Sequence, residues 1–455
     1  MMDQRTPQLS GTAGSSHYGD NVMHRQRRFA TKARTGCITC KIRKIKCDEA
    51  KPSCQRCTST GRKCDGYVAA MPKAQLASLL PSGGNHAERQ ALYMFRTKIA
   101  ISIASVVDAG FWTYDLLQTA EAYQTVQHAV AALATAYHAS ILSSHGDQME
   151  RQFILTQYNK SINSLYQCLN TPKPLTRDQK VVILMTNLVF ICICAVQGFH
   201  REACMHLQSG LSLLHEWQLV AAGADGSDTT PTPVQLLATV YTQLDTQARI
   251  IIEARTPHQK ATWRPHTVAL DGWGRGHLRA VTQAVSQLEN LHNKFIQITT
   301  LSGPVESDVH ARHHSQFIEE HRKQLLMWDL DFGWLTGEES NSIKALRMRR
   351  LLVGANLEAG LSRAGNASQC DPTWADETLK LANEIVQNSR LSEAVVAFSP
   401  AGGLVEALYF VATACPDDGI KRKCIDLLEE YPIIEGLWSS CAAYAVLNKK
   451  ARVLA

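Results

Sequence analysis

Six cysteines lie within 28 residues of this 455-residue chain, and they form one spacing pattern that occurs twice. Each half reads C-x2-C-x6-C, and each cysteine of the second half follows its counterpart by 17 residues. The six are Cys37, Cys40, Cys47, Cys54, Cys57 and Cys64. Two tetrahedral zinc ions need eight coordination positions. Six thiolates fill these only if two of them bridge both ions, and the first cysteine of each half, Cys37 and Cys54, is the natural pair.

A disulfide framework is the main alternative for so many closely spaced cysteines. The N-terminal sequence MMDQRTPQLS is polar and lacks the apolar core of roughly 7–15 residues that a secretory signal needs. The other eight cysteines are scattered through apolar segments at irregular spacing, which is typical of reduced intracellular thiols. No histidine lies between Cys37 and Cys64, which disfavours RING and LIM zinc modules. The sequence therefore predicts a cluster of two Zn²⁺ ions.

The peptide between the cysteines of the first half, CITCKIRKIKC, is strongly basic. A short helix after Cys40 would place Ile42 and Ile45 inward and its cations outward. Two Zn²⁺ ions and six thiolates sum to a charge of −2, and four cations within six residues exceed what compensation requires. These cations are Lys41, Arg43, Lys44 and Lys46. A helical turn that is fixed by zinc and carries outward cations is expected to bind a polyanion.

Positive charge is concentrated near one end of the chain. Residues 25–66 contain 13 Lys and Arg against 3 acidic residues, a net charge of +10, whereas the whole chain carries +6. The rest of the chain is therefore acidic on balance. Such a local excess is typical of a nucleic-acid-binding segment whose affinity depends on salt. The basic residues from His24 to Arg28, with Lys32 and Arg34, could serve nuclear import or contact the nucleic-acid backbone.

Residues 34–67, RTGCITCKIRKIKCDEAKPSCQRCTSTGRKCDGY, resemble the DNA-binding domain of the fungal binuclear zinc-cluster transcription factors. The loop DEAKPS is similar to the proline-containing link between the halves in that family. The resemblance implies a nuclear regulator of RNA polymerase II genes that binds double-stranded DNA at CGG triplets. It implies base contacts from Lys44, with Arg43 beside it, and phosphate contacts from Lys41, Lys46 and Lys51. Transcription machinery or co-regulators are the implied protein partners.

The composition divides the chain into four segments. We expect a disordered tail at 1–30, the binuclear zinc-cluster DNA-binding domain at 31–67, a linker at 68–85 and an all-α regulatory domain at 86–455. The linker leucines Leu76, Leu79 and Leu80 supply at most two helical turns before Pro81, whereas a coiled coil needs about three or four heptads. The oligomeric state therefore stays open between a monomer on one triplet and a dimer formed through the large domain.

From residue 86 onward, apolar residues recur at helical spacing, and alternation typical of strands is almost absent. We therefore predict a large all-α multi-helix domain without a sheet. The predicted helical segments are 87–107, 126–142, 153–169, 181–196, 234–254, 278–298, 309–327, 342–359, 374–387, 404–414 and 420–430.

Three short motifs in this region are similar to the fungal-specific regulatory domain that accompanies zinc clusters. They are FWTYDLL at 111–117, AVAALATAYHAS at 129–140 and A-x-x-H-L-x-x-G-L at 203–211.

The run VVILMTNLVFICICAV at 181–196 is the one candidate membrane span. Its 16 residues are fewer than the ~20 that a span needs, and it contains Asn187. We interpret it as a helix buried in a multi-helix core, with Cys192 and Cys194 as core thiols, and expect no membrane association.

An enzyme is not expected, because the sequence contains no HExxH, GxSxG or Walker-type motif. His310, His313 and His314 have a spacing that could bind metal on a helix, but a solvated helix face is favoured. The glycine-rich stretch DGWGRGH at 271–277 follows no buried strand, which indicates a turn rather than a phosphate-binding loop.

The segment MWDLDFGWL at 327–335 mixes acidic and large apolar residues, as some activation segments do. We interpret it as a loop whose aromatic side chains pack inward. Two further functions stay open from the sequence. One is an interaction protein whose zinc cluster binds RNA or another protein. The other is a helical sensor of a small-molecule effector, for which DNA binding is secondary.

Overall fold

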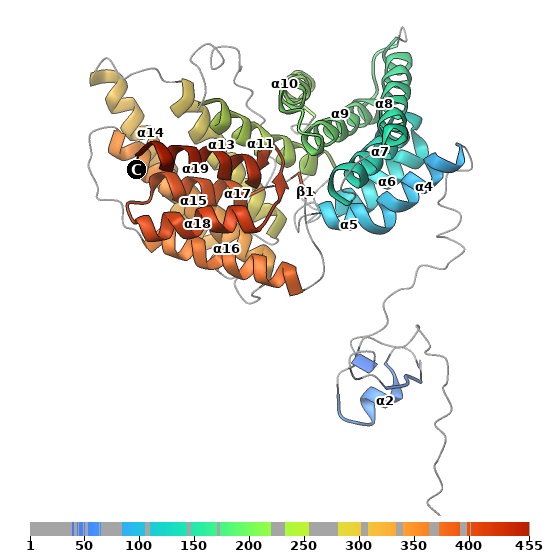
Figure 1. Cartoon of the computed structure of the whole chain (residues 1–455), viewed down its shortest axis with the longest axis horizontal. Coiled ribbons are helices and arrows are strands. Elements are labelled where there is room, and N and C mark those ends of the chain that lie inside the picture. Colours follow the sequence, from blue (N-terminus) through green and yellow to red (C-terminus); the bar gives the residue numbers. More distant parts are fainter. Residues whose placement is uncertain are drawn as a thin grey trace, which may run out of the picture. The chain divides into compact units, whose positions relative to one another are not determined.

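The computed structural model contains two compact units, Met1–Ser78 and Leu79–Ala455 (Figure 1). The predicted tail at 1–30 and residues 68–83 of the predicted linker lie outside the described residues. The structure describes residues 39–40, 43, 45–48, 50, 53–62, 64, 84–104, 110–142, 147–170, 173–219, 233–253, 281–301, 308–333, 340–363, 373–391, 398–400 and 402–454. In the first unit the cysteine-rich segment contains the short helix α2 (Gln55–Thr58).

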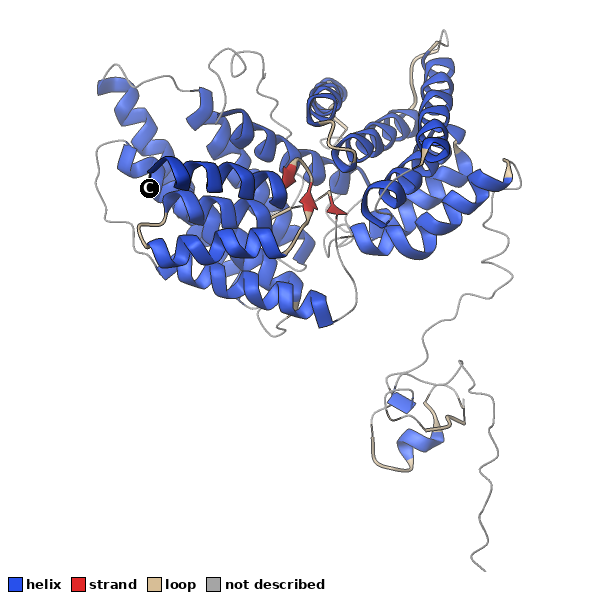
Figure 2. Cartoon of the chain, in the orientation of Figure 1, coloured by secondary structure: helices blue, strands red, loops and turns tan. Residues whose placement is uncertain are grey.

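The second unit is built almost entirely of helices (Figure 2). Each of the eleven predicted helical segments overlaps a helix over its described part, which confirms the prediction of a mostly helical domain. In the N-terminal part, helix α7 is buried over most of its length and packs against α4, α6, α8 and α9. The elements of this part are α4 (His86–Met94), η1 (Phe95–Ile99), α5 (Ala100–Ile103), η2 (Phe111–Asp115), α6 (Leu116–Ala122), α7 (Gln124–Tyr137), η3 (His138–Leu142), α8 (Gln148–Leu169), α9 (Arg177–Val196), α10 (His200–Trp217) and α11 (Pro233–Glu253).

Helix α9 contains the predicted buried run and confirms that interpretation. It is the one described helix long and apolar enough to pass for a membrane span, and 78% of its apolar window is buried by the protein itself. Cys192 and Cys194 are 1% and 6% exposed, as expected of core thiols. The hydroxyl of Tyr241 on α11 donates to Asn187 Oδ1 at 2.7 Å, which satisfies the polar residue of the run. A helix in the protein core therefore explains this sequence.

Gly210 permits close packing of α10 against these two helices. A Cβ atom at this position would lie 2.4 Å from Tyr241 Cε1 and 2.6 Å from Asn187 Oδ1. The motif at 203–211 thus brings its glycine to a three-helix contact, where a larger side chain would force the helices apart.

The C-terminal part contains two further apolar clusters. Its elements are α13 (Val281–Leu301), α14 (Asp308–Phe332), α15 (Asn341–Arg363), α16 (Thr373–Leu391), β1 (Phe398–Ser399), α17 (Leu404–Ala414), α18 (Asp418–Glu430), β2 (Ile434–Glu435), β3 (Trp438–Ser439) and α19 (Ser440–Leu454).

A buried ion cluster joins three of these helices. Arg349 on α15 donates to both carboxylate oxygens of Glu289 on α13 at 2.8 and 2.7 Å, and to Glu406 Oε2 on α17 at 2.6 Å. All three side chains are at most 5% exposed. The three helices are therefore connected by charge as well as by apolar packing.

The prediction that the domain has no sheet was wrong. Strand β1 pairs in parallel with β2, and β2 pairs antiparallel with β3. Each strand has two residues, too few to show an alternating pattern in the sequence. Gly436, with φ +57°, forms the tight turn between β2 and β3, and its N–H donates to Ser399 O at 2.7 Å.

The predicted loop at 327–335 was also wrong over its described part, because α14 continues to Phe332. Its aromatics do pack inward. Trp328 and Phe332 are 4% and 5% exposed and stack on each other, and Trp328 Nε1 donates to Ala284 O at 2.9 Å. Residues four apart lie on the same face of a helix, so the spacing of these two aromatic residues is consistent with a helix and not with the predicted loop. His310, His313 and His314 also lie on α14, and the glycine-rich stretch at 271–277 lies outside the described residues.

Candidate zinc and nucleic-acid site

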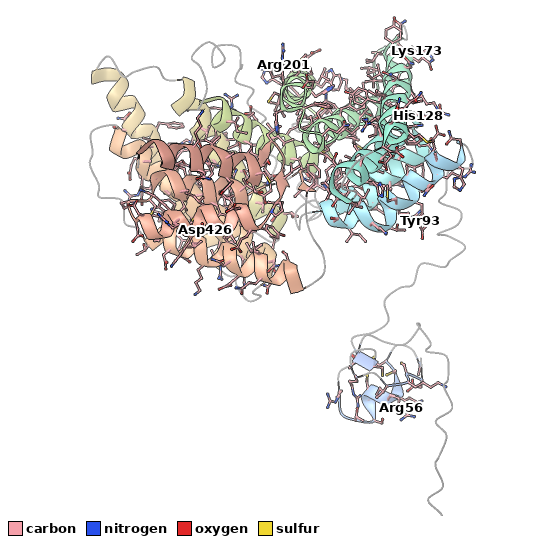
Figure 3. The ribbon with its side chains drawn as sticks, in the orientation of Figure 1. Arg56, Tyr93, His128, Lys173, Arg201 and Asp426 are labelled. Carbon is pink, nitrogen blue, oxygen red and sulfur yellow. The ribbon has the colours of Figure 1, made fainter. Side chains whose placement is uncertain are left out.

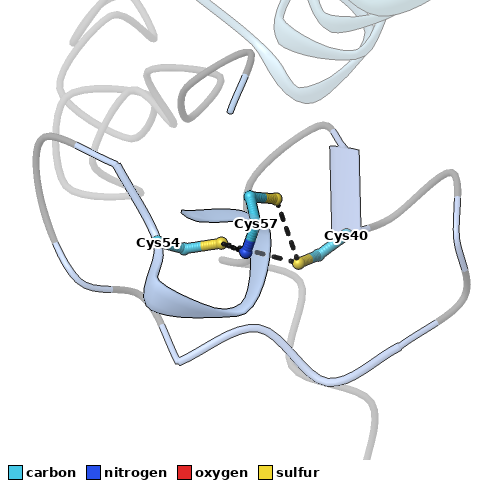
Figure 4. A group of neighbouring side chains, drawn as sticks. All are labelled: Cys40, Cys54 and Cys57. Carbon is cyan, nitrogen blue, oxygen red and sulfur yellow. Dashed lines mark hydrogen bonds between the residues drawn. The ribbon is translucent and has the colours of Figure 1, made fainter. Parts of the chain in front are cut away.

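Five of the six predicted metal ligands are described, and the structure brings them into one cluster. Cys40, Cys54 and Cys57 are fully buried, and their sulfur atoms point toward one another (Figure 4). Cys47 and Cys64 are partly buried and pack against these three. Cys37 lies outside the described residues.

The distances between the sulfur atoms fit shared metal ligation. Cys40 Sγ lies 3.6 Å from Cys54 Sγ and 3.8 Å from Cys57 Sγ. Tetrahedral ligands at the usual Zn–S distance of about 2.3 Å are separated from each other by about 3.8 Å. The sulfur atoms of a disulfide would be only about 2.05 Å apart. The cluster therefore has the spacing of thiolates around zinc and not that of a disulfide.

Cys54 occupies the centre of the described ligand set. Its sulfur lies within 4.8 Å of the sulfurs of Cys40 and Cys57, and also within 4.8 Å of Cys47 Sγ and an oxygen of Asp48. Cys54 therefore belongs to two groups of possible ligands, one with Cys40 and Cys57 and one with Cys47 and Asp48. This position suits a bridging ligand, because a bridging thiolate has to reach both ions. Zinc, when bound here, supplies the folding energy that so small a segment lacks.

Local backbone structure places the second half of the ligands. Cys54 is the N-cap of α2, and its sulfur accepts the N–H of Cys57 at 3.3 Å. After α2, Gly61 adopts φ +65°, and Arg62 N–H bonds back to Cys57 O at 3.0 Å. This left-handed residue turns the chain back toward Cys64, which explains the glycine of CTSTGRKC.

Asp48 is a functional candidate that the sequence analysis missed. Its carboxylate accepts the N–H groups of Gln55 at 3.1 Å and Arg56 at 2.7 Å, the first two residues of α2, and also that of Ala50 at 3.0 Å. The amide of Ala50, followed by those of Arg56 and Gln55, lowers the pKa of Asp48. One residue thus ties the end of the first half to the helix start of the second half. The sequence does carry a signal, because Asp follows the last cysteine of both halves, as KCD at 46–48 and at 63–65.

Replacing Asp48 with alanine is expected to weaken zinc binding about 10–100-fold, the usual cost of removing a group that orients metal ligands, and thereby to speed zinc loss to a chelator. Asp48→Asn keeps one oxygen acceptor and should lose zinc more slowly than Asp48→Ala. The measurement is the release rate followed with a chromogenic chelator on the full chain. Unchanged release from both variants would show that Asp48 does not hold the second half in place.

Two of the six predicted DNA-contacting residues are described. Arg43 is half-buried, and its Nη1 donates to Thr60 Oγ1 at 3.4 Å, which connects the two halves. Lys46 is exposed. Lys44, Lys41, Lys51 and Arg34 lie outside the described residues. In the second half, the exposed Arg56 on α2 (Figure 3) and Arg62 add positive charge that the sequence analysis counted without assigning a contact.

Ile45, which was predicted to face inward, is 40% exposed, so that prediction was wrong. Arg43 N–H bonds to Thr39 O with helical spacing, but Ile45 N–H bonds to Cys40 O, five residues back. This wider turn rotates Ile45 outward. Among the described residues of the module, sulfur atoms rather than aliphatic side chains form the buried cluster, and Ile42 lies outside those residues.

Comparison with known proteins places this segment in a family. Residues 35–73 match the model of the fungal Zn(2)-Cys(6) binuclear cluster domain. The aspercryptin biosynthesis cluster-specific transcription regulator atnN of Emericella nidulans is 26% identical over 81% of this chain and 65% of its own length. The transcription regulator lscL of Purpureocillium lilacinum is 26% identical over 43% of this chain and 52% of its own length.

Transcriptional regulatory protein moc3 of Schizosaccharomyces pombe is 43% identical over 19% of this chain and 18% of its own length. The chain thus spans less than two thirds of each of these relatives. No solved structure matches the chain. The match identifies residues 35–73 as a fungal Zn(2)-Cys(6) binuclear cluster domain, which binds two zinc ions, and the chain is similar to proteins named as transcription regulators.

Proposed function

We propose that the chain is a nuclear regulator of RNA polymerase II genes that reads CGG-type sites in double-stranded DNA. All six cysteines bind the two zinc ions, with Cys37 and Cys54 as the bridging pair. Residues 31–67 form the DNA-binding domain, 68–85 the linker and 86–455 the regulatory domain, which contacts transcription machinery or co-regulators. The observation that carries this proposal is the central position of Cys54 among sulfur atoms at metal-ligand spacing.

The charge distribution supports nucleic acid as the partner of this cluster. The described cations Lys46, Arg56 and Arg62 are exposed beside the buried sulfurs, where they are accessible to phosphates. Arg43 differs from them, because its bond to Thr60 holds the guanidinium near the junction of the halves. In the proposed complex, Lys44 and Arg43 contact bases, and Lys41, Lys46, Lys51 and Arg34 contact the backbone.

Lys44→Ala is expected to relax base preference, whereas Lys51→Ala should weaken binding to all duplexes equally. A good base contact discriminates by about 1–3 kcal/mol, so Lys44→Ala should reduce the preference for a CGG duplex over a scrambled one by roughly 5–150-fold. Lys51→Ala should leave this ratio unchanged and lower the slope of log affinity against log salt by about 0.9. The measurement is competition binding at several salt concentrations.

Equal losses of Lys44→Ala on cognate and scrambled duplexes would refute its assignment to base contact. An RNA competitor in the same assay separates DNA binding from RNA binding. RNA would displace the duplex from a cluster that prefers RNA. Selection of bound duplexes from a random pool then gives the site. The printed name of one relative, a biosynthesis cluster-specific regulator, supports a search for such sites near biosynthetic genes.

A further inference from the structure

Helix α8 presents an apolar face to solvent that the fold does not use. Leu155, Ile162, Tyr166 and Leu169 are 64%, 39%, 64% and 47% exposed. The helix lies at the edge of the helical unit (Figure 1), where its other face packs on α7. Ile154, at 3% exposure, and the buried polar residues Gln157 and Ser161 form that inner face. Packing in the core of the unit therefore explains the buried face of α8 but not the apolar residues on its exposed face.

The exposed residues follow a coiled-coil repeat. Leu155, Ile162 and Leu169 are spaced by seven residues, and the partly buried Tyr158 and Leu165 fall between them at the intervening core positions of a heptad. A repeat of 3.5 residues keeps a narrow seam aligned toward a partner helix. A solvated helix face would carry charged residues at these positions instead.

Between Gln152 and Asn170 the surroundings of this seam carry a single charged residue, although the exposed Arg151 lies one turn before Leu155 and the exposed Lys173 lies just after Asn170. Its exposed polar neighbours are Gln152, Thr156, Asn159, Asn163, Gln167 and Asn170. Lys160 is the one charged residue of α8 between Gln152 and Leu169, and its Nζ bonds to Glu88 Oε1 on α4 at 2.7 Å, away from the seam. Depletion of charge together with exposed aromatic and aliphatic residues is the composition of the centre of a protein–protein interface.

Tyr158 is held in a fixed position at the border of this surface. Its ring lies 4.3 Å from the ring of Phe190 on α9, and its hydroxyl lies 2.7 Å from His206 Nε2 on α10. A side chain anchored in this way loses little further rotamer entropy when a partner packs against it. Tyr158 is therefore a preformed part of the seam.

We propose that this face of α8 binds the same face of a second copy of the chain, with the two helices antiparallel around Ile162. In this arrangement Leu155 of each copy meets Leu169 of the other, and the two Ile162 side chains meet at the two-fold axis. Between Leu155 and Leu169 the seam can pack against itself without like-charge repulsion, and the like charges of Arg151 and Lys173 lie outside this stretch, at the two ends of the pair. A partner with a charged groove would have to bury its charges against apolar groups.

The size of the contact sets its strength. The seam from Leu155 to Leu169 is about 21 Å long at 1.5 Å per residue. At roughly 10 Å width it covers far less than the ~800 Å² per partner of a standard interface. The dimer is therefore weak and reversible. It is independent of the DNA site proposed above and supplies the self-association that the linker does not encode.

Sedimentation of the zinc-loaded full chain over a range of concentrations tests this proposal. The parent should show a monomer–dimer equilibrium, and Leu155→Glu and Ile162→Glu should each raise the dimer dissociation constant at least tenfold. Leu330→Glu is the matched control, because Leu330 on α14 is 73% exposed and lies outside the seam. It should leave the equilibrium unchanged. A monomer at all concentrations, or a dimer that resists both α8 variants, would overturn the proposal.

Cross-linking tests the antiparallel arrangement. A mixture of Leu155→Cys and Leu169→Cys chains should cross-link to each other faster than either does to itself, above the background of the native cysteines. Preferred self-cross-linking of Leu155→Cys would show a parallel pair and would contradict the arrangement. Binding of a different protein to this face without any dimer would contradict the choice of a second copy as its occupant.

Discussion

Replacing Cys54 with alanine is expected to remove both zinc ions from the chain and abolish specific DNA binding. A bridging thiolate supplies one ligand to each ion, so its loss leaves both ions with incomplete coordination. A structural zinc site in a small peptide contributes about 10–16 kcal/mol of folding free energy, which a segment with a core of sulfur atoms cannot replace. Native mass spectrometry of the purified chain measures the stoichiometry, with two ions expected for the parent and none for Cys54→Ala.

The helical unit should stay folded in this variant and after chelation of the parent. All eight tryptophans follow residue 78, so tryptophan fluorescence reports on the second unit alone. Cys441→Ala provides the matched control, since Cys441 is an exposed cysteine on α19. It should retain both ions. A Cys54→Ala chain that keeps one ion would show that Cys54 serves a single zinc and that the bridging assignment is wrong.

The cysteine cluster was predictable because metal coordination imposes its own spacing on the sequence. Two ions, tetrahedral geometry and a repeat offset of 17 residues leave few arrangements, and the structure brings together all five ligands that it describes. Asp48 was not predictable in the same way. Its hydrogen-bond partners Gln55 and Arg56 lie seven and eight residues ahead, across a loop whose path the sequence does not reveal.

The helices were predictable because apolar residues repeat every three or four positions along them. The short strands were not, since two residues show no periodicity, and their position depends on contacts such as that between Leu437 N–H and Gln247 Oε1, 190 residues apart. The sequence also gives no sign of which arginine of the segment RMRRLL is buried. Arg349 is 5% exposed and Arg350 is 31% exposed, although they are adjacent. Neighbouring residues of an α-helix point in different directions, so one arginine faces the core and the next lies near the surface.

Replacing Arg349 with alanine is expected to destabilise the helical unit by about 3–5 kcal/mol, because it leaves two buried carboxylates without a counter-charge. Burial alone would lower the pKa of Arg349, but Glu289 and Glu406 raise it, so the guanidinium is charged in the parent. Burial already raises the pKa of Glu406 above its ordinary value of 4.5, and loss of Arg349 raises it further. A carboxyl group whose pKa is raised in the folded state favours folding at a pH below its ordinary pKa. This contribution is lost as the pH rises through the raised pKa. The deficit of the variant should therefore grow as the pH increases above 4.5.

Arg350→Ala is the matched control on the next residue. Arg350 donates to both oxygens of Asp329, at 2.8 and 2.5 Å, but about a third of each side chain is exposed. Such a pair contributes only about 0.2–1 kcal/mol, because water replaces the lost partner. Urea unfolding followed by tryptophan fluorescence at two pH values separates the two variants. Equal losses for both, or a deficit of Arg349→Ala that does not change with pH, would mean that Glu289 and Glu406 find other partners once the guanidinium is gone. The ion cluster would then not be what holds α13, α15 and α17 together.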